Sequence, residues 1–533
     1  MTDFPVVRET LDDLKHKGVV ARIWQKDHTV WKPEPKEITN RLGWLALPET
    51  MRERFSELTS FAEEIRRAGY RHVVLLGMGG ASLGAEVLHD ILGSGSGYPD
   101  FRILDSTVPG WVAAVTEAID PAHTIFLVSS KSGGTIETTT FYKYFRGLVE
   151  QSVGKEHAGQ NFVAITDAGS SLAGLAEESR FRRAFLNPED VGGRYSVLSY
   201  FGLVPAALTG IDIKLILERA EKMRRQCTAD VPVKENPGAW LGALIGAFSR
   251  QGKDKLTLVT SSSVGSFGLW LEQLIAESLG KDGTGIIPVM GEPIMAPENY
   301  GDDRLFIYLR LQDDNNDDVD RAIGRIRSSG QDVITLDLED KYDICSELFR
   351  WEFATAVAGA MMDINPFDQP DVQAAKDATG RVLREFQNTG RLPSLEVPAS
   401  LGDLISEARQ GDYLAIMAFT KQVPELEKIC AELRRKVMKK HRIATTFAYG
   451  PRLLHSTGQL HKGGPNTGLF LQIIMAHEHK IPVPGVPYTF DILADAQALG
   501  DIQTLQALGR RVVRIDLSSG DTEALARTVF GLA

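Results

Sequence analysis

Short apolar runs alternate with segments of helical pattern along most of this chain. Between residues 71 and 210, four runs rich in Val, Ile, Leu and Phe end near Gly, Ser or Asp, and helical patterns separate them. This alternation is typical of a doubly wound parallel sheet, whose strands are almost entirely apolar because helices cover both faces. The strands predicted on this basis are 73–77, 101–104, 124–128 and 162–166.

The same alternation returns further along the chain, and a third segment follows Pro393. The second series predicts strands at 256–260, 305–311 and 333–338, and the third has candidates at 444–447 and 512–515. We therefore expect an α/β protein with two doubly wound, three-layer αβα domains, an N-terminal helical arm and a C-terminal α/β extension. The expected boundaries are 1–45, 46–225, 226–392 and 393–533.

Composition narrows the class of protein. The 533 residues are 43% hydrophobic and 24% charged, which predicts a soluble globular chain of two or three domains. The formal charge of 59 − 70 = −11 argues against a nucleic-acid surface. Without a basic-then-apolar leader or an apolar run of about 18 residues, we expect a cytoplasmic protein with no membrane contact. The three cysteines are far apart, and they predict neither a disulfide framework nor a zinc site.

The segment 129–138, Ser-Ser-Lys-Ser-Gly-Gly-Thr-Ile-Glu-Thr, follows a buried-looking strand and opens a helical run. The free N–H groups of a first helical turn, together with the helix dipole, favour a bound anion. The hydroxyls of Ser130, Ser132 and Thr135 add donors, and two glycines let the backbone approach closely. The pattern predicts a cradle for a phosphate ester. An N-capped helix after a β-turn is the alternative interpretation.

Two glycine-rich stretches lie near this loop in the predicted sheet. The first, 77–84, does not fit the G-x-G-x-x-G fingerprint, and no acidic residue follows where a ribose would need it. We therefore disfavour NAD and expect a tight turn beside a sugar phosphate. The second, 191–196, places Arg194 behind two glycines, where a guanidinium can hold an oxyanion. A surface arginine in a loop is the alternative.

Two later segments carry candidate acid–base groups. Glu277 lies late in an apolar helix, and partial burial there would raise its pKa and make it a usable base. A solvent-facing carboxylate, or an ion pair with Lys281 four residues on, is the alternative. Gln369 and Lys376 lie about two turns apart where a loop becomes a helix, so both can face one cleft, although either can equally be an ordinary surface residue.

In their order, these motifs resemble the glucose-6-phosphate isomerases, which are built from two sugar-isomerase (SIS) domains. The resemblance is nearest to the isomerase part of bacterial transaldolase/phosphoglucose isomerase fusions, without a transaldolase part, and it spans roughly residues 45–530. The motifs that carry it are SSKSGGTIET (129–138), VGGRYS (191–196), QLIAESLGK (273–281), NPFDQPDVQAAK (365–376) and LLHSTGQLHKGGPNTGLFLQI (453–473).

The resemblance implies a reaction and a role for individual residues. Glucose 6-phosphate and fructose 6-phosphate interconvert through a cis-enediolate, in glycolysis and gluconeogenesis, with Glu277 as the base and Arg194 offsetting the enediolate charge. Lys376 assists ring opening, and Glu137 helps to order the phosphate loop, to which Lys131 contributes mainly through its backbone. No metal or other cofactor is implied. The implied substrate contacts are Gly80, Ser130, Lys131, Ser132, Thr135, Gly193, Gln369 and His455.

The chain departs from the family at the histidine that opens the sugar ring. Relatives carry it in a Gly-Gln-His segment after the catalytic glutamate, but no histidine follows Pro293 in the corresponding stretch here. The candidates are His455 and His461, and we favour His461 because Gly-Gln precedes it; either can instead be structural or contact phosphate. Since relatives receive this histidine from a second subunit, the resemblance also implies a homodimer.

The nature of the anion stays open. The phosphate loop has a Ser-Gly-Gly core rather than a threonine-rich one, and Ala81 stands where many relatives have a serine. The alternatives are an isomerase of another 6-anionic hexose, such as a mannose phosphate or a sulfonated sugar, and a non-catalytic SIS protein that senses a phosphosugar. Glu277 together with Arg194 and Lys376 argues against a sensor, which needs no base.

Overall fold

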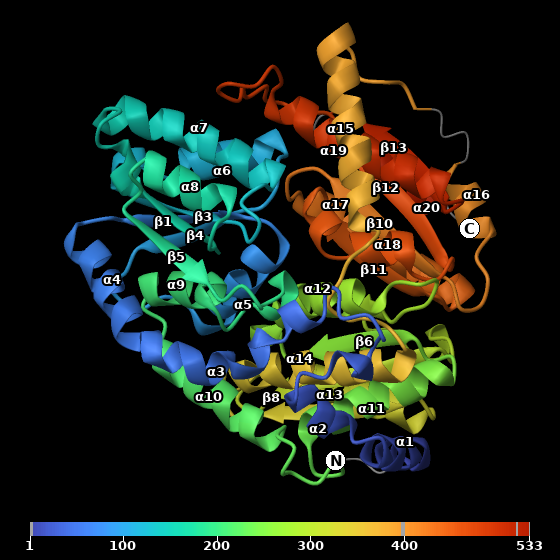
Figure 1. The fold of residues 1–533 in the computed structure, drawn as a ribbon. Coiled ribbons are helices and arrows are strands. Elements are labelled where there is room, and N and C mark those ends of the chain that lie inside the picture. The colour runs from blue at the N-terminus through green and yellow to red at the C-terminus, as the bar shows by residue number, and fades with distance from the viewer. Residues whose placement is uncertain (1–3, 396–399, 519–520, 532–533) are drawn as a thin grey trace.

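The structure, a computed structural model, describes residues 4–395, 400–518 and 521–531. Three parallel sheets lie in succession along the chain, and helices cover both faces of each (Figure 1). The α/β class and the doubly wound parallel sheets are confirmed. The C-terminal extension also contains a parallel sheet of its own. The boundaries expected between the domains stay a prediction.

The first sheet has the order β2-β1-β3-β4-β5. β1 is buried along almost its whole length because helices pack on both of its faces. β5, at the edge, alternates buried and exposed positions, and its short, mixed pattern escaped the sequence prediction. The strands are β1 His72–Gly77, β2 Asp100–Leu104, β3 Thr124–Ser129, β4 Phe162–Asp167 and β5 Arg183–Asn187, and the helices are α4 Phe55–Arg67, α5 Leu83–Leu92, α6 Pro109–Glu117, α7 Ile136–Val153, α8 Ser171–Glu178, α9 Tyr200–Leu208 and α10 Ile213–Gln226.

The second sheet has the order β7-β6-β8-β9 and shares a continuous apolar core with the first part of the chain. β7 has three residues, too few for a pattern to predict. The strands are β6 Lys255–Thr260, β7 Ile287–Val289, β8 Arg304–Leu311 and β9 Val333–Leu338, and the helices are α11 Pro237–Arg250, α12 Phe267–Leu279, α13 Asp317–Ser328 and α14 Asp343–Met362.

The third sheet has the order β11-β10-β12-β13 and a core of its own. Its two central strands were not predicted from the sequence, because a short run that is apolar throughout looks the same as a buried helix. The strands are β10 Tyr413–Phe419, β11 Ala444–Tyr449, β12 Gly468–Met475 and β13 Arg511–Leu517, and the helices are α16 Leu401–Ser406, α17 Pro424–His441, α18 Gly458–Gly463, α19 Phe490–Ala507 and α20 Glu523–Gly531.

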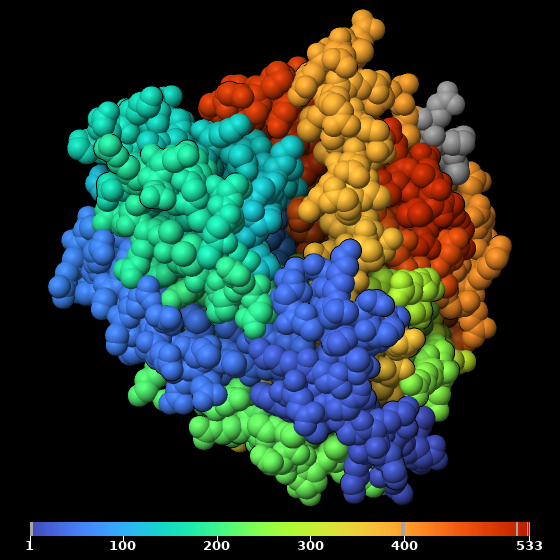
Figure 2. Space-filling model, viewed as in Figure 1, coloured from blue at the N-terminus to red at the C-terminus, as the bar shows by residue number. Residues whose placement is uncertain are grey.

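Two segments connect or cover these sheets. The N-terminal arm, with α1 (Pro5–His16), α2 (Val19–Trp24) and α3 (Leu47–Thr50), packs mainly against the second part, where the Trp31 indole donates to the Ala356 carbonyl at 2.7 Å. The long helix α15 (Val372–Thr389) packs along α19. Figure 2 shows the surface hollowed where the first part, in teal, faces α15, in light orange.

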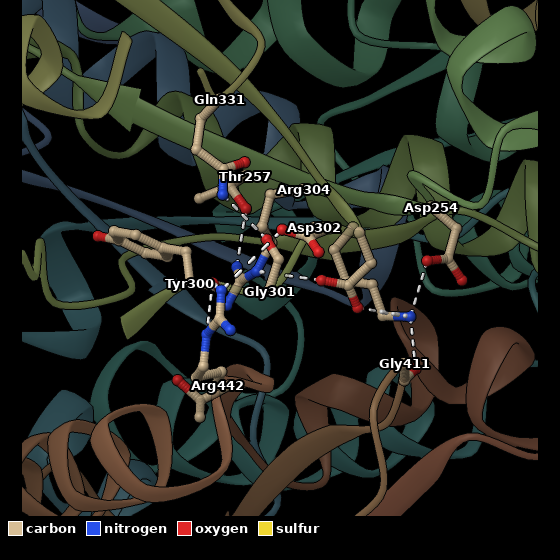
Figure 3. A network of polar contacts seen from close by, with 12 residues as sticks. Asp254, Thr257, Tyr300, Gly301, Asp302, Arg304, Gln331, Gly411 and Arg442 are labelled. Atoms are coloured by element: carbon tan, nitrogen blue, oxygen red, sulfur yellow. Dashed lines mark hydrogen bonds and ion pairs between the residues drawn. The ribbon is translucent and has the colours of Figure 1, made fainter. Parts of the chain in front are cut away.

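Polar contacts join the second and third parts. The buried Lys255 ammonium donates to the Gly411 carbonyl at 2.5 Å. The Arg442 side chain is exposed, and its guanidinium donates to the Tyr300 carbonyl at 2.7 Å (Figure 3). Glu292 pairs with Arg304 at 2.9 Å and accepts the Thr445 N–H at 2.7 Å. Buried charges are costly unless paired, so these contacts hold the two parts in one arrangement.

Candidate active site

The glycine turn after β1 and the hydroxyl-rich loop after β3 lie side by side at the carboxyl edge of the first sheet. β1 and β3 are neighbours, and their parallel register pairs Gly77 with Ser129. Open α/β sheets bind ligands outside the carboxyl ends of their strands. The structure therefore brings these two candidate loops to the place where a ligand is expected.

The loop before α7 holds its own hydroxyl groups in place. The Ser130 hydroxyl lies 3.0 Å from that of Thr135 and accepts the Gly133 N–H at 3.2 Å, and the Ser132 hydroxyl accepts the Gly134 N–H at 3.3 Å. Gly133 has a φ of +71°, and a Cβ there would approach the α8 backbone to 2.5 Å, so the turn requires glycine. Because α7 begins directly after the loop, its first N–H groups face the same space.

Unlike the hydroxyl groups of this loop, the Lys131 side chain binds residues outside the loop. Its ammonium forms an ion pair with Asp167, at the end of β4, and donates to the Glu189 carbonyl at 3.3 Å. The side chain is therefore engaged with the neighbouring part of the sheet edge. Its backbone remains the part of Lys131 that the loop presents.

The turns at Gly80 and Gly193 touch through their backbones. A Cβ on Gly80 would lie 2.1 Å from the Gly193 carbonyl oxygen, so no larger residue fits at position 80. This close approach sets the short 3₁₀ helix η8 (Gly193–Tyr195) against the glycine turn and places Arg194 near the carboxyl edge of the first sheet.

Glu277 and Arg194 form a buried pair. The Arg194 Nε lies 3.2 Å from Glu277 Oε2, and the exposed fractions of the two side chains are 4% and 11%. Burial raises the pKa of Glu277, while the positive charges of Arg194 and His455 oppose that rise. Gln273, one turn earlier in α12, donates to Glu277 at 3.3 Å and to the His455 carbonyl at 2.9 Å. Glu277 is thus a desolvated carboxylate held next to a fixed positive charge.

The segment from 365 to 369 wraps around the same guanidinium. Arg194 donates to the Asp368 carbonyl at 3.0 Å and to the Gln369 side-chain oxygen. Lys281, which the sequence offered as an ion-pair partner for Glu277, instead binds the Asn365 carbonyl at 2.8 Å and the Asp368 carboxylate at 2.7 Å. Burial lowers the pKa of this lysine to about 8. Lys281 therefore anchors the segment and leaves Arg194 as the partner of the base.

A cavity of about 230 Å³ lies next to His455, and neither Glu277 nor Arg194 lines it. Gln273 connects the pair to this cavity, because it donates both to Glu277 and to the His455 carbonyl. The loop before α7 forms one wall, α15 forms another, and the third part of the chain closes it with His455 and Gln497. Lys376, on α15, and Glu137, at the start of α7, face each other across it. The residues that line the cavity include Ser132, Thr135, Glu137, Lys376, His455 and Gln497.

Glu137 holds the histidine of this cavity. His455, the last residue of the short helix η11 (Arg452–His455), donates from Nε2 to Glu137 Oε1 at 2.8 Å. Burial disfavours the charged form of Glu137, but the charge and hydrogen bond of His455 outweigh it and hold the pKa below its usual value. Sequence reasoning assigned Glu137 to ordering the phosphate loop. Its hydrogen bond to His455 was not foreseen.

The preference for His461 is not supported by the structure. This side chain is buried inside α18, its ring packs 5.0 Å from that of Phe470 on β12, and burial lowers its pKa well below the usual value. It does not line the cavity, whereas His455 does. The physical reason is the direction of α18, which turns position 461 toward the third sheet.

Two residues at the site carried no sequence signal. Gln497 and Thr107 lie in unremarkable helical or loop patterns and take part only through contacts across the fold. Gln273 and Lys281 belong to the 273–281 motif, but their contacts with His455 and Asn365 were not predicted. Among the described residues, no group of three or more His, Cys, Asp or Glu side chains is arranged to hold a metal ion. Within the same residues, no helix is both long and apolar enough to cross a membrane.

Part of this chain is similar in sequence to a known protein family. Residues 49–287 match the phosphoglucose isomerase family. The glucose-6-phosphate isomerases of Streptococcus pyogenes (serotype M28) and Streptococcus pneumoniae (serotype 19F) are each 28% identical over 383 residues, covering 63% of this chain and 85% of the relative.

Two solved structures share the fold with a TM-score of 0.62 each. One is a hypothetical protein from Thermus thermophilus, 24% identical, which covers 73% of this chain and 98% of its own. The other is a glucose-6-phosphate isomerase from Chlamydia trachomatis, 17% identical, with coverages of 72% and 87%. At these identities the likeness concerns the fold.

Proposed function

We propose that this chain, of which residues 49–287 match the phosphoglucose isomerase family, is an aldose–ketose isomerase that interconverts glucose 6-phosphate and fructose 6-phosphate. The observation that supports this proposal most strongly is the buried pair of Glu277 and Arg194, which Gln273 and His455 connect to a cavity lined by a hydroxyl-rich helix start. A desolvated carboxylate next to a permanent cation is the arrangement that proton transfer through an enediolate needs.

The sugar phosphate is anchored at its phosphate end. The hydroxyls of Ser130, Ser132 and Thr135 and the first N–H groups of α7 supply the donors, and the helix dipole favours the dianion. Gly80 and Gly193 let the backbone come close to the sugar. Lys376, across the cavity, adds a positive charge on the other side of the bound substrate.

Ring opening comes first, because only the open-chain form has a carbonyl that acidifies the neighbouring C–H. His455 and Lys376 line the cavity and are the groups able to move a proton between the ring oxygen and the C1 hydroxyl. Glu137 holds Nε2 of His455, which leaves Nδ1 as the nitrogen for the sugar. We therefore assign ring opening to His455 in place of His461.

Isomerisation then moves one proton between two carbons. Glu277 takes the proton from C2 of the aldose, negative charge spreads into the cis-enediolate, and the same proton returns to C1 to give the ketose. Arg194 offsets the charge of the enediolate, since a guanidinium stays protonated throughout. Burial raises the pKa of Glu277 and so strengthens it as a base. Gln369 holds Arg194 from the other side.

The resemblance implied a homodimer in which a second subunit supplies the histidine. In this chain His455 reaches the cavity from the third part of the same polypeptide, so the site needs no partner for that group. A dimer and a cytoplasmic location remain proposals. Light scattering at several concentrations, compared with the activity per chain, tests whether assembly and turnover depend on each other.

A coupled assay tests the main proposal. The chain is expected to convert fructose 6-phosphate to glucose 6-phosphate, followed as NADPH with glucose-6-phosphate dehydrogenase, and to run the reverse reaction. Turnover of mannose 6-phosphate alone would replace the proposed substrate with another hexose phosphate. Tight binding of these sugars without turnover of any would overturn the enzymatic assignment and leave a phosphosugar sensor.

A further inference from the structure

We infer that Gln497, on α19 of the third part, is a positioning residue for ring opening that acts through Glu137 on His455. The inference rests on the proposed function and deepens it, because it concerns one step of that reaction. Nothing in the sequence distinguishes Gln497 from the other glutamines of the helix. The hydrogen bonds of its amide group distinguish it.

Gln497 forms the middle of a buried chain of hydrogen bonds. Its Nε2 donates to Glu137 Oε1 at 2.6 Å, and its Oε1 accepts the Thr107 hydroxyl at 2.6 Å. The same Glu137 oxygen accepts Nε2–H of His455 at 2.8 Å. Thr107, Gln497 and Glu137 are exposed by 0%, 2% and 3%, so water does not compete for these contacts.

The direction of the amide group follows from its two neighbours. A carboxylate accepts hydrogen bonds only, so the Gln497 NH₂ must face Glu137, and the Gln497 oxygen must then face Thr107. The opposite orientation would set an amide oxygen against a carboxylate. The Thr107 hydroxyl therefore fixes the amide, and the amide fixes one of the two oxygens that Glu137 can offer.

A fixed Glu137 oxygen determines where the His455 ring points. Without the hydrogen bond from Gln497, the carboxylate could rotate and carry the imidazole with it, because both contacts converge on one oxygen. Displacement of a catalytic group by about 1 Å costs roughly 100-fold in rate. Gln497 lines the cavity only beside Glu137 and His455 and makes no contact with Glu277 or Arg194 in the described structure. Its effect should therefore fall on ring opening and leave proton transfer at carbon unchanged.

Exchange between the two anomers of glucose 6-phosphate measures ring opening alone, because anomers interconvert through the open chain without losing the C2 proton. In a Glu277→Gln background, we expect the protein to accelerate this exchange, measured by NMR, although it no longer isomerises. Adding Gln497→Leu should lower the exchange rate roughly 10- to 100-fold while the Kd for the sugar phosphate stays the same. Gln506→Leu, an exposed glutamine on the same helix, should leave exchange unchanged.

A second substitution separates the hydrogen bond from packing. In Gln497→Glu, the new carboxyl can donate to Glu137 only while it holds a proton. Its anomer exchange, taken as a ratio to that of the parent at each pH, should therefore rise as pH falls. The ratio for Gln497→Leu should stay flat with pH. A purely structural role for Gln497 would give both variants the same pH-independent ratio.

The possible results distinguish failure of the proposed isomerase function from failure of the inference about Gln497. Absence of isomerisation in the wild-type chain contradicts the proposed function. With an active wild type, unchanged anomer exchange in Gln497→Leu overturns the inference, and so does an equal loss in Gln506→Leu. In Gln497→Leu with Glu277 intact, a loss of C2 proton exchange greater than the loss of anomer exchange would also overturn it, because Gln497 would then act on Glu277. Melting temperatures within a few degrees of the parent establish that the variants fold.

Discussion

Glu277 is subject to two opposing influences on its charge. Burial raises the pKa of its carboxyl, and Arg194, 3.2 Å away, stabilises the ionised form. The balance leaves the pKa above its ordinary value, so the ionised carboxylate is a stronger base than a solvent-exposed glutamate. A carboxylate with neither influence would be too weak a base, and one with burial alone would stay protonated.

Replacement of Glu277 by glutamine should abolish isomerisation while binding persists. The amide keeps the shape of the side chain and cannot accept the C2 proton, so kcat should fall by roughly 100- to 10,000-fold. The coupled assay measures turnover, and calorimetry with fructose 6-phosphate measures binding. Glu298→Gln, at an exposed position, is the control. Retention of more than a tenth of the activity would remove Glu277 from the role of base.

The acid limb of the pH profile should report the raised pKa of Glu277. Activity needs the ionised carboxylate, so kcat/KM should fall as pH drops through a midpoint above 4.5, the ordinary value for this side chain. Because Arg194 holds that pKa down, Arg194→Gln should move the midpoint to higher pH as well as slow the reaction. An acid limb that stays in place in this variant would contradict the assignment.

Among the elements, η11 brings the third part of the chain to the proposed active site. Arg452 opens this short helix and pairs with Asp105 at 2.6 Å and with Glu86, both in the first part. Three residues later, His455 reaches Glu137. At the carboxyl edge of the third sheet, Trp111, near the start of α6, donates to the carbonyl of Thr420, just after β10, at 3.2 Å. The third part therefore contributes to the proposed site through η11 and α19, while the edge of its own sheet contacts α6.

Arg452→Met should destabilise the protein and displace His455 together. The change leaves Asp105 buried without its partner, and the loss of one member of a buried ion pair costs about 3–5 kcal/mol. Urea denaturation measures the loss, and the coupled assay the activity. Arg435→Met removes an exposed ion pair with Glu432 and should cost less than about 1 kcal/mol. Equal losses in the two variants would show that η11 is not held by this pair.

The proposed active site lies where all three parts of the chain meet. The first part supplies the phosphate loop and Arg194, the second supplies Glu277 from α12, and the third supplies His455 and Gln497. The first two parts share one core, and buried charges join the third to the second (Figure 3). Shared packing of this kind allows groups from distant segments to keep distances fixed to within a fraction of an ångström.

The core shared by the first two parts also contains a buried carboxyl group that lowers the free energy of unfolding at neutral pH. Glu352, on α14, is fully buried, and neither of its oxygens has a hydrogen-bond partner among the described residues. Burial raises its pKa well above 4.5. In the unfolded chain the carboxyl ionises near its ordinary pKa, whereas in the folded protein it stays protonated, so it reduces stability progressively as pH rises above that value.

Glu352→Gln should therefore stabilise the protein relative to the wild type as pH rises. The difference in free energy of unfolding between variant and wild type should grow from pH 4 to pH 8, because burial raises the pKa of Glu352 in the folded protein. Denaturant titrations at several pH values measure it. Glu339→Gln, at an exposed position, should show no such trend. A difference that is constant with pH would mean that Glu352 is ionised in the folded protein.

Local pattern alone determined the class of the fold and most of the proposed site. Seven strands of the first two sheets could be predicted from short runs of Val, Ile, Leu and Phe, because most of them are buried between helices; β2 and β9 are partly exposed. The hydroxyl-rich loop, Arg194, Glu277 and Lys376 could be singled out because each lies in a motif whose residues are adjacent in the chain. Residues that are adjacent within such a motif are also adjacent in the folded protein.

The tertiary structure decided the features that depend on distant segments. His455 and His461 lie six residues apart, and only the direction of α18 shows that one faces the cavity and the other the third sheet. Gln497 touches Glu137 across 360 positions of sequence, so no local pattern could have indicated it. The physical reason is that apolar periodicity reports which face of an element is buried, whereas packing of the whole chain determines what that face meets.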